Sequence, residues 1–121
     1  TPSLVELFHV FCGLEEELTT HLMKEEMILF PAIAEMSQGQ GDTIAVDGPI
    51  ACMLQEHNEA GEAMARLREL SHGFQPPADA CNTYRALFAG LRDLEDDLHR
   101  HIHLENAVLF PLARAMAERK A

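Results

Sequence analysis

Residues 21–31 read HLMKEEMILFP, and residues 101–111, eighty positions later, read HIHLENAVLFP. His, Glu, Leu, Phe and Pro match in register at five positions of these two segments. In both copies a His precedes a Glu by four residues, which advances a helix by about one turn, so the two side chains share one helix face. Two such pairs in a small chain predict one buried metal centre, clamped from two helices.

The composition predicts a single small helical domain. The 121 residues are 47% hydrophobic but only 6% aromatic, so the apolar content is mainly aliphatic and suits packed helices. No apolar run approaches the roughly 20 residues that cross a bilayer, and the first residues lack a signal-peptide pattern. The net charge of −11 repels phosphate backbones, which argues against nucleic-acid binding. We expect a cytoplasmic protein with no membrane partner.

Three cysteines, Cys12, Cys52 and Cys81, are scattered along the chain, and none belongs to a CxxC pair. An odd, scattered set does not resemble a disulfide framework. Because free cysteines are among the most buried residue types, we expect reduced, buried thiols.

Hydrophobic periodicity predicts an all-α fold, an up-down bundle of three long helices. The helices are expected at about residues 3–36, 49–71 and from 79 or 80 to 118, with a loop at 37–48 and a linker at 74–80. Gly73 fits a left-handed cap after the second helix, while Pro31 and Pro111 should kink the helices or start new turns. Three helices with a two-sided apolar stripe leave part of the core uncovered, since a four-helix bundle needs one more.

The apolar stripes predict which side chains face inward. On the first helix the expected inner residues are Leu7, Phe11, Leu14, Leu18, Leu22 and Ile28 or Leu29, and on the third they are Leu87, Leu91, Leu94, Leu98, His101, Glu105, Val108 and Leu112. The six methionines are interpreted as core filler because helical spacing explains them.

His57 is the third candidate ligand. It lies on the apolar stripe of the second helix and, taken alone, is interpreted as a core histidine with one partner. Beside two His–Glu pairs it becomes the natural third histidine. An alternative remains for each pair, namely a hydrogen bond within the helix. His103 lies two residues from His101, about 200° around the helix, so it should face away from the centre.

These residues resemble the hemerythrin-like, or HHE cation-binding, domain. The similarity rests on three ordered motifs, at residues 21–31, 56–62 and 101–111, and is strongest to the branch called repair of iron centres, the di-iron proteins of iron–sulfur cluster repair. The resemblance implies a four-helix bundle holding two irons. Glu25 and Glu105 would bridge the metals, and His21, His57 and His101 would be terminal ligands.

The resemblance also implies a departure from the family. The family has an earlier helix that supplies two further histidines, and residues 1–121 begin after the position of that helix. We therefore interpret residues 1–121 as an N-terminally incomplete hemerythrin-like metal-binding domain. Its di-iron site would be incomplete, or completed by water, anions or a partner chain, and the uncovered face would favour a homodimer.

Three functions compete on these grounds. The first is repair of iron–sulfur clusters damaged by oxidative or nitrosative stress, by iron donation or nitric oxide chemistry, with iron–sulfur proteins as clients. The second is a module that binds O2 reversibly or senses iron. The third is a metal-depleted fragment that dimerises. Whether the chain is an enzyme stays open, and no nucleophile elbow or phosphate loop occurs.

Overall fold

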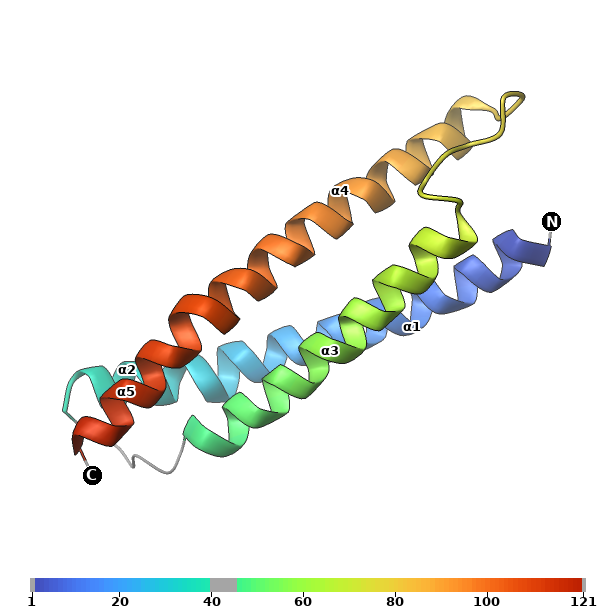
Figure 1. Ribbon diagram of the computed structural model, residues 1–121. Helices are drawn as coiled ribbons and strands as arrows, with labels where there is room; N and C mark the ends of the chain where they lie inside the picture. Colours follow the sequence, from blue (N-terminus) through green and yellow to red (C-terminus); the bar gives the residue numbers. More distant parts are fainter. Residues whose placement is uncertain (1, 40–45, 121) are drawn as a thin grey trace.

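The computed structural model describes residues 2–39 and 46–120, which form helices and connecting turns with no β-strand among them (Figure 1). The first rod is continuous and comprises α1 (Pro2–Lys24), the π-helical turn η1 (Glu25–Leu29) and α2 (Phe30–Ser37). The second rod is α3 (Asp47–Leu70). The third comprises α4 (Asn82–Leu104), the π-helical turn η3 (Glu105–Leu109) and α5 (Phe110–Lys120). The predicted all-α bundle of three long helices is confirmed.

The connections between the rods agree in part with the predictions. Of the loop expected at 37–48, residues 40–45 lie outside the described residues, and α3 already begins at Asp47. The acidic side chain of Asp47 suits the positive end of the helix dipole. At the other end of α3, the left-handed conformation begins at His72 (φ 53°) and includes Gly73 (φ 74°), whose N–H bonds to the Arg68 carbonyl at 2.7 Å, so a left-handed cap does follow the helix.

Of the two alternatives expected at the prolines, a kink or a new turn, the structure shows the second, because π-helical turns precede Pro31 and Pro111 and new α-helical segments begin at Phe30 and Phe110. In each turn the N–H of a Phe bonds to the carbonyl of a Glu five residues earlier, from Phe30 to Glu25 and from Phe110 to Glu105. The next residue in each copy is a proline, which lacks the N–H that a regular helix would use. A π-turn adds one residue to a helix, so the side chains beyond it are rotated relative to a regular α-helix.

This rotation explains an error in the predicted inner face of the third rod. Val108 and Leu112 were expected inside, but they are exposed. Phe110, Ala113 and Ala117 are buried instead, one residue further along than α-helical spacing from Glu105 requires. Leu22 and Leu87 were also expected inside and are exposed, whereas Leu29, the alternative to Ile28 on the first helix, is buried.

The apolar core consists of two clusters, one toward each end of the bundle. The first contains Leu7, Leu14, Ala60, Met64, Leu67, Phe74, Phe88, Leu91 and Leu98. The second contains Leu29, Met36, Val46, Ile50, Met53, Phe110, Ala113 and Ala117. Along every rod the two clusters are separated by buried polar residues: His21 and Glu25 on the first, His57 on the second and Glu105 on the third. The core is thus interrupted by a polar layer.

An ion pair ties α3 to α4 near the first cluster. The Arg68 guanidinium donates to both carboxylate oxygens of Glu95, at 2.7 to 3.2 Å, and also lies over the ring of Phe74, 5.2 Å from its centroid. Hydrogen bonding to Arg68 lowers the pKa of the Glu95 carboxyl against the opposing effect of burial. The pair thus joins the C-terminal part of α3 to the middle of α4.

Two composition-based expectations need correction. The three cysteines are exposed rather than buried, because burial frequencies average over proteins while helix phase decides each case. Cys12, for example, lies two residues before the buried Leu14 and so on the opposite side of α1. Met23 and Met27 are also exposed and are not core filler.

No helix among the described residues combines the length and apolarity of a membrane span.

Candidate metal centre

Four polar side chains meet in the layer between the two apolar clusters. His21, Glu25, His57 and Glu105 are each at most 4% exposed. Each of them offers one ring nitrogen or carboxylate oxygen, and these atoms all lie within 4.8 Å of one another. The residues come from all three rods, so the fold brings together groups that are up to 84 positions apart in the sequence (105 − 21).

Helix geometry places each pair as predicted. The Nε2 atom of His21 lies 3.2 Å from the Oε1 atom of Glu25, one turn later on the first rod. His101 Nε2 lies 3.2 Å from Glu105 Oε2 on the third rod and also 3.4 Å from Glu25 Oε1. His101 therefore contacts both carboxylates, although its side chain is 41% exposed. All five residues predicted from the sequence lie together.

His57 completes the group from α3. Its Nε2 atom lies 2.8 Å from Glu105 Oε1. Its ring stacks on Phe110, with centroids 5.8 Å apart and an angle of 9° between the planes, and its centroid is 5.0 Å from that of His21. His103, by contrast, is exposed, which agrees with the prediction that it faces away.

Two further residues orient the buried histidines, and sequence reasoning missed both. Glu56 Oε1 lies 2.8 Å from His21 Nδ1, and its other oxygen accepts from Lys24 Nζ at 2.6 Å. Asn106 Oδ1 lies 2.7 Å from His57 Nδ1. Neither residue stands on a buried stripe, so periodicity gave no signal for them. Their role depends on how the rods are placed side by side, which one helical pattern does not contain.

These hydrogen bonds determine where the ring protons lie. Lys24 and His21 lower the pKa of the Glu56 carboxyl against the effect of burial, so this group is a carboxylate that only accepts hydrogen bonds. The amide oxygen of Asn106 likewise only accepts. His21 and His57 therefore each carry a hydrogen on Nδ1. In a neutral ring this leaves the Nε2 lone pair directed at the carboxylates, which is the arrangement of metal-ligating histidines.

Among the described residues, no lysine or arginine forms an ion pair with Glu25 or Glu105. Four buried atoms have no hydrogen-bond partner, namely His21 Nε2, Glu25 Oε2, His57 Nε2 and Glu105 Oε1. Leaving one buried polar atom unsatisfied costs about 1–3 kcal/mol, and more for a charged group. The short contacts of His21 Nε2 with Glu25 and of His57 Nε2 with Glu105 thus bring acceptors together without satisfying these buried atoms. A cation among them removes this cost, so the residues fit a bound metal ion.

The carboxyl groups differ in their affinity for protons. Burial raises the pKa of Glu105, contact with His57 opposes the rise, and the neighbouring Glu25 adds to it. Burial would also raise the pKa of Glu25, but interactions with His21 and Glu105 outweigh it and hold the value at about 2. The pKa of His21 is raised, because Glu25 and Glu56 outweigh the lowering effect of burial. Protons thus provide part of the positive charge that the site attracts.

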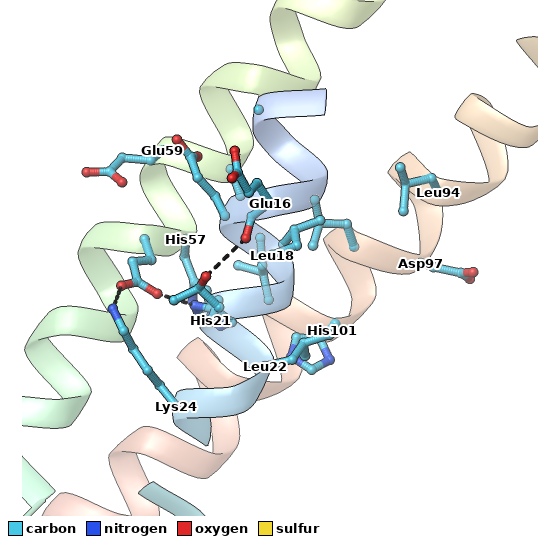
Figure 2. A pocket seen from close by; sticks show the side chains of 17 residues that line it. Glu16, Leu18, His21, Leu22, Lys24, His57, Glu59, Leu94, Asp97 and His101 are labelled. Carbon is cyan, nitrogen blue, oxygen red and sulfur yellow. Dashed lines mark hydrogen bonds and ion pairs between the residues drawn. The ribbon is translucent and has the colours of Figure 1, made fainter. Parts of the chain in front are cut away.

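A cavity of about 650 Å³ lies beside the centre and reaches His21, His57 and His101 (Figure 2). Its walls come from α1, α3 and α4, and its apolar lining includes Leu18, Leu22, Leu94, Leu98 and Ile102. Acidic side chains also line it, including Glu16, Glu59 and Asp97. Cations and small apolar molecules can approach the exposed edge of His101 from this cavity.

Comparisons with known proteins show which sequences this chain is similar to. The iron-sulfur cluster repair protein YtfE of Cronobacter sakazakii is 49% identical over 102 residues, covering 84% of this chain and 44% of the relative. The YtfE protein of Pectobacterium carotovorum is 50% identical over 97 residues, covering 80% and 42%. That of Escherichia coli O1:K1 is 48% identical over 102 residues. The chain spans less than half the length of these curated relatives.

The family comparison covers nearly all of the chain. Residues 2–113 match the hemerythrin HHE cation binding domain, and this segment contains all five of the residues gathered at the centre. The chain therefore belongs to the hemerythrin HHE cation-binding domain family.

Proposed function

We propose that this chain holds two iron ions in its buried polar layer and serves in the repair of iron–sulfur clusters damaged by oxidative or nitrosative stress. One observation carries the proposal: four buried ligand-type atoms, two imidazole nitrogens and two carboxylate oxygens, have no hydrogen-bond partner. Carboxylates with imidazoles from facing helices form the di-iron sites of bundle proteins. The similarity to iron-sulfur cluster repair proteins supports the cellular role.

Each residue has a proposed part in the centre. Glu25 and Glu105 would hold the metal from the first and third rods, as the bridging carboxylates that the family resemblance implies, and both contact His101. His21, His57 and His101 act as terminal ligands. Glu56 and Asn106 keep the protons of the buried rings on Nδ1, so that Nε2 is available. The bound iron itself supplies a redox-active cation that can also be transferred.

The cavity is the proposed way in and out of the centre. Its apolar walls limit the access of water, and its acidic side chains favour the approach of iron cations. His101 is the most exposed of the five residues, so we expect release of iron, or entry of nitric oxide, on its side. The clients are proposed to be iron–sulfur proteins whose clusters have lost iron.

The apolar lining of the cavity also favours a second candidate function. O2 is small and apolar, and an apolar cavity that reaches His101 suits reversible binding of this gas beside the iron. A module that binds O2 or senses iron needs the same centre but no client protein. The two functions therefore differ in what the chain does once iron is bound: it acts on a client protein in the first and binds O2 or reports iron in the second.

Metal content tests the centre itself. The chain is loaded with Fe(II) without oxygen, desalted and measured by elemental analysis, and we expect about two irons per chain. The Glu25→Gln variant should lose iron. The matched Glu26→Gln variant, in which the neighbouring exposed carboxylate of the same π-turn is changed, should keep it. One iron per chain would contradict the paired centre, and none would support the metal-depleted alternative.

A second experiment separates repair from gas binding. A [4Fe–4S] enzyme inactivated by peroxide is incubated with the iron-loaded chain or with an equal amount of free Fe(II). Faster recovery of the enzyme with the loaded chain supports repair. Recovery no faster than with free Fe(II), together with reversible spectral changes on cycling between O2 and argon, would favour the O2-binding module instead.

A further inference from the structure

Asn106 is a neutral side chain placed directly against a buried candidate ligand. It is the second residue of η3 and is exposed, yet its Oδ1 atom lies 2.7 Å from Nδ1 of His57, whose side chain is only 3% exposed. The equivalent residue in the first copy of the motif is Glu26, but the acceptor at Nδ1 of His21 is Glu56 of α3. Both buried histidines thus meet an acceptor from another rod, but one acceptor is a carboxylate and the other is a neutral amide.

The stacking of His57 on Phe110 cannot orient the ring by itself. Rotation of the imidazole by about 180° about its last side-chain torsion keeps the ring in the same plane, so the stack with Phe110 tolerates both orientations. This rotation exchanges the positions of Nδ1 and a ring carbon. Only interactions in the plane of the ring distinguish the two orientations, and the hydrogen bond to Asn106 is the one made at Nδ1, while Nε2 faces Glu105.

We propose that Asn106 is a positioning residue of the metal centre, which selects both the orientation and the tautomer of His57. The Nδ1–H donates to the amide oxygen, so Nε2 holds a lone pair and points at Glu105, 2.8 Å away. Without the acceptor, the hydrogen can move to Nε2 or the ring can turn, and either change removes a nitrogen donor from the centre. This inference rests on the metal centre proposed above.

The π-turn is what brings Asn106 into position. Glu105 and Asn106 are adjacent, and their side chains on a regular helix diverge by about 100°. In η3 both nevertheless contact the same imidazole, Glu105 at Nε2 and Asn106 at Nδ1. The widened turn lets two consecutive residues hold opposite edges of one ring, which agrees with the occurrence of π-turns at functional sites.

The test uses three variants of the 121-residue chain. Asn106→Leu removes the acceptor at similar size, and Asn106→Asp retains an oxygen acceptor. Asn58→Leu is the matched control, because Asn58 is exposed and adjacent to His57 in the sequence. Two readouts are taken: the ring tautomer of His57 in metal-free protein, by long-range ¹H–¹⁵N NMR, and the affinity for Co(II), by titration of its visible absorption bands.

The expected results are specific. The unchanged chain, Asn106→Asp and Asn58→Leu should show the Nδ1–H tautomer, and Asn106→Leu should show a mixture. Asn106→Leu should bind Co(II) about 10- to 100-fold more weakly, as is usual when an outer hydrogen-bond partner is lost, while its far-UV circular dichroism stays the same. A purely structural role would lower the melting temperature without changing the tautomer.

Two outcomes would overturn the inference. The first is an unchanged tautomer and Co(II) affinity in Asn106→Leu, and the second is an equal loss of affinity in Asn58→Leu. Failure of the metal centre itself is recognised separately, since the unchanged chain would then bind no Co(II) whatever the tautomer of His57.

Discussion

Replacing Glu105 by Gln should make the metal-free protein more stable and the metal-loaded protein less stable. Glu105 is 4% exposed, and its carboxylate faces that of Glu25 within the buried group whose ligand atoms lie within 4.8 Å of one another. Gln has nearly the same shape but no charge. It removes the repulsion between the carboxylates and, with it, one of the two anionic groups that attract a cation.

The size of the effect follows from this separation. Two unit charges about 4.8 Å apart repel by roughly 3 kcal/mol at an effective dielectric constant of 20. Burial and the neighbouring Glu25 raise the pKa of Glu105, but contact with His57 offsets part of this cost, so we expect Glu105→Gln to gain about 1–2 kcal/mol. At roughly 4 °C per kcal/mol for a chain of this size, the metal-free melting temperature rises by about 4–8 °C.

Bound metal should make the native chain more stable than the Glu105→Gln variant. A free metal concentration about 100 times the dissociation constant stabilises the native chain by about 2.7 kcal/mol, or roughly 10 °C, and the variant should gain far less.

The stability difference between the metal-free variant and the native chain should depend on pH with a defined sign. A carboxyl whose folded pKa is raised destabilises the fold when it is ionised, so the advantage of Gln is full at neutral pH. It disappears as the pH falls below the ordinary value of 4.5.

Thermal unfolding followed by circular dichroism measures all of these quantities, in chelator and in excess metal, with Glu26→Gln as the control. Glu26 is exposed and occupies the position after Glu25 in the other π-turn, so its replacement should change neither curve. The reasoning is refuted if Glu105→Gln melts below the native chain in chelator and still gains the full stabilisation from metal.

Three further predictions concern the surroundings of the centre. His101→Ala should lower the iron content per chain, whereas His103→Ala, which changes an exposed residue, should leave it unchanged in elemental analysis. Arg68→Met should cost about 2–3 kcal/mol in urea unfolding at pH 7, because it leaves the Glu95 carboxylate buried and unpaired. Since the pKa of Glu95 is lowered in the folded chain, this difference should be present above pH 4.5 and shrink as the pH falls toward the lowered value; a constant difference would contradict it. Cys52 should react with iodoacetamide more slowly at pH 8 in the native chain than in urea, because partial desolvation and a nearby carboxylate raise its pKa, and equal rates by mass spectrometry would contradict this.

Much of the site was predictable because it depends on the geometry of one helix at a time. A His four residues before a Glu shares its face in any helix, so the pairs His21–Glu25 and His101–Glu105 needed no knowledge of the partner helices. The place of His57 followed from its apolar neighbours on α3. The all-α class followed in the same way, from long stripes separated by glycine- and proline-rich segments.

The parts that were not predictable depend on a change of helical period or on relations between rods. Val108 and Leu112 were expected inside because the period was taken as constant, and the π-turn at Glu105 shifts the buried positions by one residue. Glu56 and Asn106 are selected by the approach of one rod to another. The proposed roles of the five clustered residues, the homodimer and the cytoplasmic location stay predictions.

The polar layer between the two apolar clusters has a consequence for cooperativity. Each apolar cluster is small. Along every rod, the residues of the first cluster are separated from those of the second by the polar layer. In chelator the two ends should behave as separate unfolding units, with amide protons of α2 and α5 exchanging independently of those in the first half of α1. An ion bound by all three rods joins the halves, so hydrogen exchange at both ends should slow together, and resistance to proteases should rise with iron supply.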